Sequence, residues 1–422
     1  MTETIHDLIG VGFGPSNLAL AIALHERQSP VDALFLEARP GFAWHPGMMI
    51  PGADMQVSFL KDLVTLHNPA SGFSFLSYLH ERGRLERFVN RKSFFPSRVE
   101  FNDYLGWAAA KLGTICAYDQ RVTAIEPVDR QGQITLLRIR AEDECGRVTT
   151  RLARQIVLAP GGAPHWPAPF ADHQGVPGLS HSSDFTHAVL PHVRPGQSVA
   201  VIGGGQSASE IFAALAAHPA GLSVDLILRG HALKPADDSP FVNEIFDIAH
   251  TDLLFGMSPR QQQAFRQDFA ATNYAVTDID LLQQIHCLLY EQSVIGEERL
   301  ALRRDTAVAG LRPGPAGLAL TLKTPQGRQD RHYDHVILCT GYRREAETLG
   351  LTGLASWIQC GQPDRQYRLP MRPGFLPAIH VQGYSEQTHG LSDTLLSVLA
   401  VRAQEIAASV EAAHRGQLLA AE

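Results

Sequence analysis

The chain has few cysteines for its 422 residues, and none of them forms a closely spaced pair. No CxxC or CxxxxC motif is present, because the five cysteines are Cys116, Cys145, Cys287, Cys339 and Cys360. This spacing excludes a disulfide framework, a cysteine zinc site and the redox pair of a flavin-dependent disulfide reductase. We therefore expect reduced thiols and no metal site.

An excess of positive charge is also absent. The 36 Lys and Arg residues are outnumbered by 43 Asp and Glu residues, which gives a formal net charge of -7 and argues against nucleic-acid partners. The apolar stretch 8–24 is interrupted by Gly10, Gly12, Gly14 and Pro15 and is too short to span a membrane. No basic segment precedes an apolar run at the N-terminus, so we expect no signal peptide and a cytoplasmic location.

Glycine, in contrast, occurs twice in the same arrangement. Each glycine turn follows a short apolar strand and opens a helix, in the segments DLIGVGFGPSNLALAIAL and SVAVIGGGQSASEIFAALAA. The residues of the two turns are Gly10, Gly12, Gly14 and Pro15, and then Gly203, Gly205 and Ala208. Such a turn brings backbone N–H groups and the positive end of a helix close to a pyrophosphate. Two of them predict two nucleotides in one enzyme, a flavin and a nicotinamide.

The strand that follows each turn indicates which nucleotide it binds. The strand ALFLEA ends at Glu37, where a carboxylate can bind the ribose hydroxyls of FAD. The strand SVDLILRG ends at Arg229, which could pair with a 2'-phosphate and so favours NADPH over NADH. The alternative for Arg229 is an ordinary solvated cation at the end of a strand.

The order of these segments predicts an α/β fold with two Rossmann-like domains, the second inserted into the first. We expect a FAD-binding part over residues 1–165 and an NADPH-binding domain with substrate loops over 166–334. The segment HVILCTGY repeats the earlier pattern IVLAPGG, so we expect the chain to return to the FAD domain over 335–422 and to end in a helix. The substrate site is expected at the interface of the two domains.

Several polar residues stand out between these motifs. Lys61 follows Met55 and Gln56 in a largely apolar segment, where its ammonium could either extend to solvent or hold a substrate carboxylate. Asn243 and Asn273 could be turn residues or amides that orient a ligand. No Ser-His-Asp order or paired-acid motif is present, so the protein is expected to position a cofactor that carries the chemistry.

The longest of these segments resemble one family, the flavin-dependent amino-acid N-hydroxylases of siderophore biosynthesis, and within it the bacterial L-ornithine N5-monooxygenases. The similarity extends over nearly the whole chain. It is carried by DLIGVGFGPSNLALAIAL, MQVSFLKDLVTL, SFLSYL, FPSRVEFNDYL, VIGGGQSASE, LKPADDSPFVNEIF, NYAVTD, CTGY and HGLSDTLLSVLAVRAQEI.

The resemblance implies a reaction of FAD, NADPH and O2. NADPH reduces the flavin, O2 forms a C4a-hydroperoxyflavin that bound NADP+ protects, and the side-chain amine of the substrate becomes a hydroxylamine. The product would be a precursor of siderophore hydroxamates. The resemblance also implies a homo-oligomer, a tetramer.

The resemblance further implies the residues of the site. FAD is expected to contact Gly10, Gly12, Gly14, Pro15, Glu37, Trp44 and His45, and the flavin ring Met55 and Gln56. NADPH is expected to contact Gly203, Gly205, Gln206, Ser207, Arg229, Asn273 and Tyr274. The amino acid is expected to contact Lys61, Asn243 and Ser397. Met55, Gln56 and Asn273 are the positions expected to act in catalysis.

Other substrates remain open at this point. The segments HNPASGF and HPGMM depart from the pattern of the family near the flavin and the substrate pocket. An N-hydroxylase of L-lysine, of a diamine or of histamine is therefore the alternative. A binding protein without catalysis is disfavoured by two intact nucleotide turns.

Overall fold

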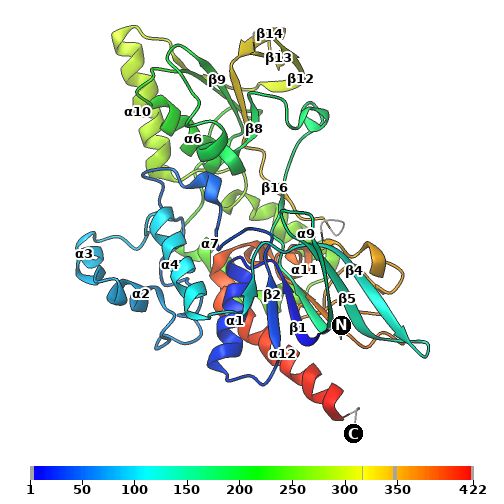
Figure 1. Cartoon of the computed structure of the whole chain (residues 1–422). Helices are drawn as coiled ribbons and strands as arrows, with labels where there is room; N and C mark the ends of the chain where they lie inside the picture. The colour runs from blue at the N-terminus through cyan, green and yellow to red at the C-terminus, as the bar shows by residue number, and fades with distance from the viewer. Residues whose placement is uncertain (1–3, 316, 346–348, 420–422) are drawn as a thin grey trace.

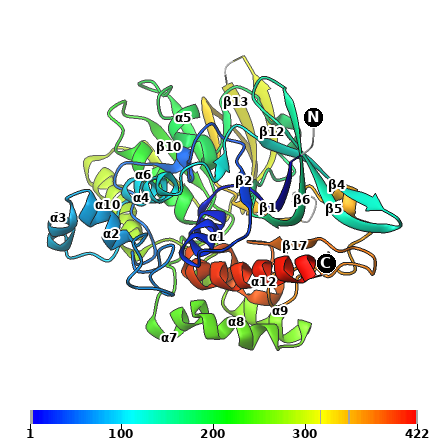
Figure 2. The same cartoon turned by 60° about the horizontal axis from the view of Figure 1, so that its bottom comes forward.

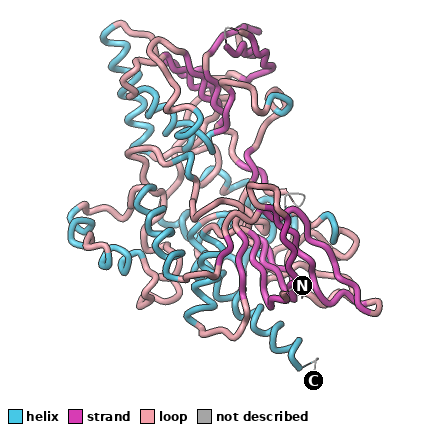
Figure 3. Tube along the Cα trace, in the orientation of Figure 1, coloured by secondary structure: helices cyan, strands magenta, loops and turns pink. Residues whose placement is uncertain are grey.

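Two sheets, each with its own helices, organise the computed structural model (Figures 1 and 3). The structure describes residues 4–315, 317–345 and 349–419, so the predicted domain limits at residues 1 and 422 lie outside the described residues. Within the described part, no helix is long and apolar enough to cross a membrane.

The first sheet has seven strands in the order β3-β2-β1-β6-β5-β4, with β17 also beside β6. Strands β1, β2, β3, β6 and β17 are paired in parallel, whereas β4 and β5 form an antiparallel extension of β6. The bounds are β1 (Ile5–Val11), β2 (Ala33–Leu36), β3 (Cys116–Ala117), β4 (Arg121–Arg130), β5 (Gln133–Glu142), β6 (Val148–Leu158) and β17 (Ala378–Val381).

Both faces of the first sheet are covered, because successive strand residues point to opposite sides. Leu8 belongs to a core formed with α1 (Pro15–Glu26), α4 (Arg98–Lys111) and α12 (Leu399–Leu419). Its neighbour Ile9 belongs to a second core, formed with β5 and the segment from Leu349 to Val381. Strands buried on both faces explain the continuous apolar runs of the sequence.

The second sheet has five parallel strands in the order β11-β10-β9-β15-β8. Val199 packs on one face with α6 (Gln206–Ala216) and α10 (Ile279–Ile295), and Ala200 packs on the other with an antiparallel ribbon. The strands are β8 (Leu179–His181), β9 (Ser198–Ile202), β10 (Ser223–Ile227), β11 (Leu300–Arg303) and β15 (His335–Leu338), and the ribbon is β12 (Ala307–Gly314), β13 (Gly317–Thr324) and β14 (Gly327–Tyr333).

The fold class is as predicted, since the chain leaves the first sheet after β6, completes the second sheet and returns with β17. The point of return differs from the expected one. β15 lies between β9 and β8 of the second sheet, and not in the first sheet as predicted from residue 335 onwards. An apolar strand followed by glycine has the same pattern in either sheet, so the sequence does not reveal its pairing partner. The connecting segments themselves pair as β7 (Ala163–Pro164) and β16 (Tyr342–Arg343).

Part of the second unit reaches back to the first. Helices α8 (Ile248–Phe255) and α9 (Pro259–Asp268) contact α11 (Glu386–His389) and lie beside α12 in Figure 2. Ile245 and Phe246 form a small core there with Leu391. The remaining helices are α2 (Phe75–Glu81), α3 (Leu85–Asn90), α5 (Phe185–Ala188) and α7 (Pro240–Asn243).

Candidate cofactor and substrate site

The first glycine turn joins β1 to α1 and leaves no room for side chains at its first two glycines. A Cβ on Gly10 would lie 2.2 Å from the Phe35 ring, and one on Gly12 would lie 2.5 Å from the carbonyl oxygen of Ala159. Gly12 also has a φ of +82°, which favours glycine. Gly14, the N-cap of α1, has open space around it and no side chain to cap the helix. This open helix N-terminus fits a pyrophosphate.

Glu37 lies directly against this turn. Its Oε2 accepts a hydrogen bond from the Phe13 N–H at 2.8 Å, and its Oε1 accepts one from the Arg39 N–H at 3.0 Å. The carboxylate is buried, with 8 % of the residue exposed. The prediction placed Glu37 beside the first nucleotide, and in the structure its carboxylate lies against the first glycine turn.

The second glycine turn repeats this construction between β9 and α6. A Cβ on Gly203 would lie 2.5 Å from the carbonyl oxygen of Cys339, on the neighbouring strand end. Gly205 is the N-cap of α6 and also lacks a capping side chain. The Cα of Ala275 lies 3.4 Å from the position of a Cβ on Gly205, so the loop that carries Asn273 and Tyr274 approaches this turn.

Gln206, Ser207 and Arg229 have different surroundings in the structure. Gln206 is held by hydrogen bonds to Glu210 and Asp278, at 3.0 and 3.1 Å. Ser207 is half-buried in the first turn of α6. Arg229 follows β10, is exposed, and has no hydrogen-bonded or ion-pair partner among the described residues. An unpaired guanidinium in this position suits a phosphate group.

Trp44 and His45 lie at the junction of the two units. The Trp44 N–H donates to Oδ1 of Asn102 at 2.9 Å, and the His45 ring lies 5.8 Å from the ring of Tyr342, in β16. Burial lowers the pKa of His45 to about 4, and the charges of Arg98, Arg39 and Arg344 add to this. His45 is therefore neutral at physiological pH.

Met55 and Gln56 follow in the same connecting segment. Met55 is buried, and its N–H donates to the carbonyl oxygen of Pro96 at 2.8 Å. Gln56 donates from Nε2 to Oδ2 of Asp278 at 3.3 Å, which links it to the second unit. Asp278 was not among the predicted site residues, although it is the last residue of the segment NYAVTD.

Lys61 lies on a loop that its neighbour Asp62 fixes. The Asp62 carboxylate is buried and accepts hydrogen bonds from the N–H groups of Val64, Thr65 and Phe75, at 3.0, 2.7 and 2.7 Å. Burial raises the pKa of Asp62, and these hydrogen bonds oppose the shift. Among the described residues, the half-buried Lys61 ammonium has no hydrogen-bonded or ion-pair partner. Asp62 therefore anchors the loop, and the Lys61 charge has no described counter-ion.

The other predicted substrate and nicotinamide residues lie on segments that meet near the start of α12. Asn243 ends α7 and donates to the carbonyl oxygen of Asp238 at 2.7 Å. Asn273 is half-buried, and the next residue, Tyr274, donates its hydroxyl to Glu386. Burial and this hydrogen bond raise the pKa of Tyr274. Ser397 is buried in the turn that precedes α12. Within the described residues, no hydrogen bond joins Lys61, Asn243 and Ser397 directly.

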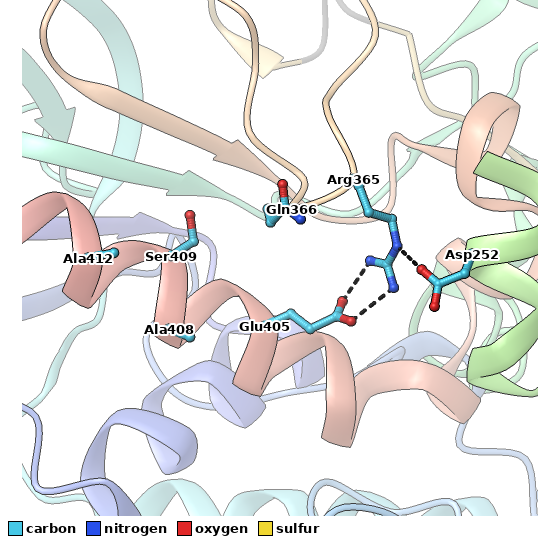
Figure 4. A pocket seen from close by; sticks show the side chains of 7 residues that line it. All are labelled: Asp252, Arg365, Gln366, Glu405, Ala408, Ser409 and Ala412. Atoms are coloured by element: carbon cyan, nitrogen blue, oxygen red, sulfur yellow. Dashed lines mark hydrogen bonds and ion pairs between the residues drawn. The ribbon is translucent and has the colours of Figure 1, made fainter. Parts of the chain in front are cut away.

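A hollow of about 600 Å³ lies away from these residues, between α8 and α12 (Figure 4). Arg365 forms two hydrogen bonds of 2.9 Å with Glu405 of α12 and one of 2.6 Å with Asp252 of α8. Because Arg365 is already paired, the described residues that line the hollow offer no free cation. The ion pairs of Arg365 connect α8 of the second unit to α12 of the first.

Three charged residues that pair across the chain were not predicted from the sequence. Arg98 pairs with Glu210 of α6 at 2.7 Å, and Arg402 of α12 donates to the Ser16 hydroxyl at 3.0 Å. Arg98, Glu210 and Arg402 all lie inside segments that carry the family resemblance, but their pairing across the chain has no local sequence signal.

Comparisons with known proteins agree with this arrangement. The family model described as L-lysine 6-monooxygenase/L-ornithine 5-monooxygenase matches residues 4–344. The chain is 42 % identical over 417 residues to the L-ornithine N(5)-monooxygenase of Pseudomonas aeruginosa, with 97 % of this chain and 94 % of that protein covered.

Two solved structures are similar over almost their whole length. The ornithine hydroxylase of Pseudomonas aeruginosa has a TM-score of 0.94 at 41 % identity, covering 97 % of this chain and 100 % of its own. The ornithine N-hydroxylase of Kutzneria sp. 744, whose structure has reduced FAD, NADP+ and L-ornithine, has a TM-score of 0.91 at 39 % identity and covers 97 % and 99 %. The resemblance stated from the sequence is thereby confirmed: the chain belongs to the L-lysine 6-monooxygenase/L-ornithine 5-monooxygenase family.

Proposed function

We propose that this protein is an L-ornithine N5-monooxygenase that uses FAD, NADPH and O2. The reaction converts NADPH, a proton, O2 and the side-chain amine into NADP+, water and the N-hydroxylated amine. Such a product is the precursor of a hydroxamate, so a role in siderophore biosynthesis follows. The names of the relatives at about 40 % identity support ornithine as the substrate.

The single observation that carries the choice of an amino acid is the unpaired ammonium of Lys61. Its loop is fixed by the buried carboxylate of Asp62, and no described residue neutralises it. A half-buried charge without a partner is unfavourable, so a carboxylate from the ligand is its natural complement. Asn243, which has a free amide oxygen among the described residues, would hold the same end of the ligand.

Each unit would bind one cofactor at its own glycine turn. The first unit would hold FAD through Gly10, Gly12, Gly14 and Pro15, with Glu37 on the ribose. Bound FAD, once reduced by NADPH, would supply the chemistry that activates O2. Trp44, His45, Met55 and Gln56 would border the flavin, and Ser397 would close the substrate pocket.

The second unit would hold NADPH at its own glycine turn. The residues proposed for this are Gly203, Gly205, Gln206, Ser207, Arg229, Asn273 and Tyr274. Arg229 would select the 2'-phosphate, because a guanidinium forms charge-assisted hydrogen bonds with phosphate oxygens. The described residues near the site offer no dedicated proton-abstracting dyad, so binding, orientation and exclusion of water are what the chain contributes.

Hydroxylation of L-lysine is the second candidate, because the matching family includes lysine 6-monooxygenases. A difference of one methylene contributes only ~1–3 kcal/mol of discrimination. The longer chain would move the amine past the oxygen donor, so lysine should stimulate NADPH oxidation with little hydroxylation. A diamine such as putrescine lacks the carboxylate and would meet Lys61 with a charge of the same sign.

The test is an assay of the purified protein with FAD, NADPH and O2. Ornithine, lysine, putrescine and histamine are compared by hydroxylamine product and by NADPH oxidation. We expect the highest kcat/KM with ornithine. A higher kcat/KM with putrescine or histamine would overturn the proposal. By family resemblance we also propose a tetramer that works in the cytoplasm, which size measurement and cell fractionation would check.

A further inference from the structure

One carboxylate connects the flavin side of the proposed site to the nicotinamide side. Oδ2 of Asp278 accepts a hydrogen bond from Nε2 of Gln56 at 3.3 Å and another from Nε2 of Gln206 at 3.1 Å. Gln56 belongs to the first unit, and Gln206 opens α6 directly after the second glycine turn. Asp278 is the N-cap of α10 and follows the loop of Asn273 and Tyr274.

The chemistry of the donors and acceptors fixes both amides. The Asp278 N–H donates to Oε1 of Gln206 at 2.9 Å, while the Asp278 carboxylate accepts from Nε2 of the same side chain. A main-chain N–H only donates and an ionised carboxylate only accepts, so the Gln206 amide has a single satisfactory orientation. By the same argument, Nε2 of Gln56 faces Asp278, and its Oε1 remains an acceptor without a described partner.

These contacts belong to a closed circuit. Gln206 also donates to Glu210 at 3.0 Å, and Glu210 pairs with Arg98, which donates to the carbonyl oxygen of Met48 at 3.0 Å. Met48 and Gln56 lie in the same connecting segment, so the main chain between them closes the circuit. The circuit contacts the second unit at Glu210, Gln206 and Asp278 and the first unit at Arg98 and Gln56. The residues that precede Glu210 and Asp278 in the sequence, Ser209 and Thr277, also form a buried hydrogen bond of 2.8 Å with each other.

The pKa of Asp278 is affected by nearby charges and by its two amide partners. Burial raises the pKa of Asp278, and the carboxylates of Glu210 and Asp238 raise it further. The hydrogen bonds from Gln56 and Gln206 oppose that shift. The two hydrogen bonds that favour the ionised carboxylate also hold both amides against it.

We propose that Asp278 is a positioning residue, which orients Gln56 towards the flavin and Gln206 towards bound NADP+ through a single carboxylate. This inference rests on the proposed function for its reaction but not for its geometry. Loss of the carboxylate would loosen NADP+ and let oxygen escape as H2O2 before it reaches the amine. Gln56 would lose its hydrogen-bond acceptor, and Gln206 would keep only its bonds to Glu210 and to the Asp278 N–H.

The experiment uses the holoenzyme with Asp278→Asn, which keeps the size of the side chain and removes its charge. We expect the NADP+ dissociation constant, measured by titration calorimetry, to rise about tenfold, and the hydroxylated product per NADPH to fall about tenfold. Gln56→Leu should lower the product per NADPH to a similar extent and leave the NADP+ dissociation constant within twofold.

The double variant Asp278→Asn/Gln56→Leu separates positioning from general damage. If Asp278 acts on coupling through Gln56, then at saturating NADP+, where its weaker binding no longer contributes, the product per NADPH of the double variant equals that of Gln56→Leu alone. Losses that multiply, or an NADP+ dissociation constant within twofold of the wild type in Asp278→Asn, would overturn the inference.

Two further variants keep the test decisive. Asp278→Ser retains a residue favoured at a helix N-cap but is too short to reach both amides, so it replaces Asp278→Asn should that variant not fold. Asp280→Asn, on an exposed position of the same helix, is the matched control and should behave as the wild type. An inactive wild type that still shows the NADP+ effect would refute the proposed function and not this inference.

Discussion

Arg98 and Glu210 form a two-point ion pair between the helices of the two units. Nη1 and Nη2 of Arg98 lie 2.8 and 2.7 Å from Oε2 and Oε1 of Glu210. Their side chains are only 13 % and 5 % exposed. One residue lies on α4 beside the first sheet, and the other lies on α6 after the second glycine turn. The pair therefore fixes the helix that would carry NADPH relative to the FAD-binding unit.

Removing one partner of this pair should destabilise the protein strongly. Arg98→Met leaves the Glu210 carboxylate buried without its cation, which typically costs about 3–5 kcal/mol. The free energy of unfolding from urea titration checks this. Arg147→Met is the control, because Arg147 pairs with Asp143 but is 79 % exposed, and its loss should cost less than about 1 kcal/mol. Equal losses in the two variants would contradict a special role for Arg98.

Arg229 should determine the choice between NADPH and NADH. Loss of a hydrogen bond to a charged group costs ~1.5–3 kcal/mol, so Arg229→Ala should raise the KM for NADPH roughly 10- to 100-fold. NADH has no 2'-phosphate, so its KM should change little. Steady-state kinetics with both cofactors measure this, with Arg328→Ala, exposed on β14, as control. Equal losses with both cofactors would show that Arg229 does not contact the phosphate.

Asn273 should limit the escape of activated oxygen. It lies beside the loop residues that approach Gly205, and no described residue occupies its amide. We expect Asn273→Ala to release more H2O2 per NADPH, because NADP+ would be held less firmly. A peroxide assay measures the release, and stopped-flow spectra follow flavin reoxidation. Asn90→Ala, at the exposed end of α3, is the control. An unchanged reoxidation rate in Asn273→Ala would refute the role.

Sequence patterns predicted the parts of the fold that depend on residues close together in the chain. Both glycine turns, the strands around them and the insertion of one unit into the other follow from apolar runs and from closely spaced glycines, some of which leave no room for a side chain. Gly12 is an example, since both its φ and the nearby Ala159 carbonyl exclude a side chain. The resemblance of long segments then pointed to the family.

The sequence could not predict which distant segments pair. β15 has the pattern of a strand in either sheet, and only its contacts with β9 and β8 place it. Asp278 and Glu210 are ordinary acids in the sequence, and their partners lie 222 residues away at Gln56 and 112 residues away at Arg98. Such polar contacts join residues that are far apart in the sequence, so no local pattern indicates them.

His380 should make the stability of the protein fall in mild acid. It is fully buried on β17, and burial with the charge of Arg368 lowers its pKa to about 3. In the unfolded chain a histidine has a pKa near ~6.5, so between these values only the unfolded state binds the proton. Stability is thus present above pH ~6.5 and is lost as the pH falls towards 3, by about 2 kcal/mol at pH ~5.

His380→Gln should remove this part of the acid sensitivity. Its amide can still bond to the Ser409 hydroxyl, which lies 2.9 Å from Nε2 of His380. Urea unfolding at pH ~7.5 and ~5 compares the variant with the wild type, and the exposed His286→Gln on α10 is the control. A wild-type loss that persists unchanged in His380→Gln would exclude His380 as its source.

Lys61 should determine the affinity for the amino acid and not for the nicotinamide. The ammonium has no described partner, and the buried Asp62 keeps its loop in place whether or not Lys61 is present. Lys61→Ala should therefore fold normally and raise the KM for ornithine by roughly 10- to 100-fold, as expected for loss of a charged hydrogen bond. The KM for NADPH should stay within a factor of about two, since Arg229 and the second glycine turn are untouched. Lys323→Ala, exposed on β13, controls for loss of a positive charge. An equal rise in the KM for ornithine and for NADPH, or a loss of kcat/KM with putrescine as large as that with ornithine, would show that Lys61 does not bind the carboxylate.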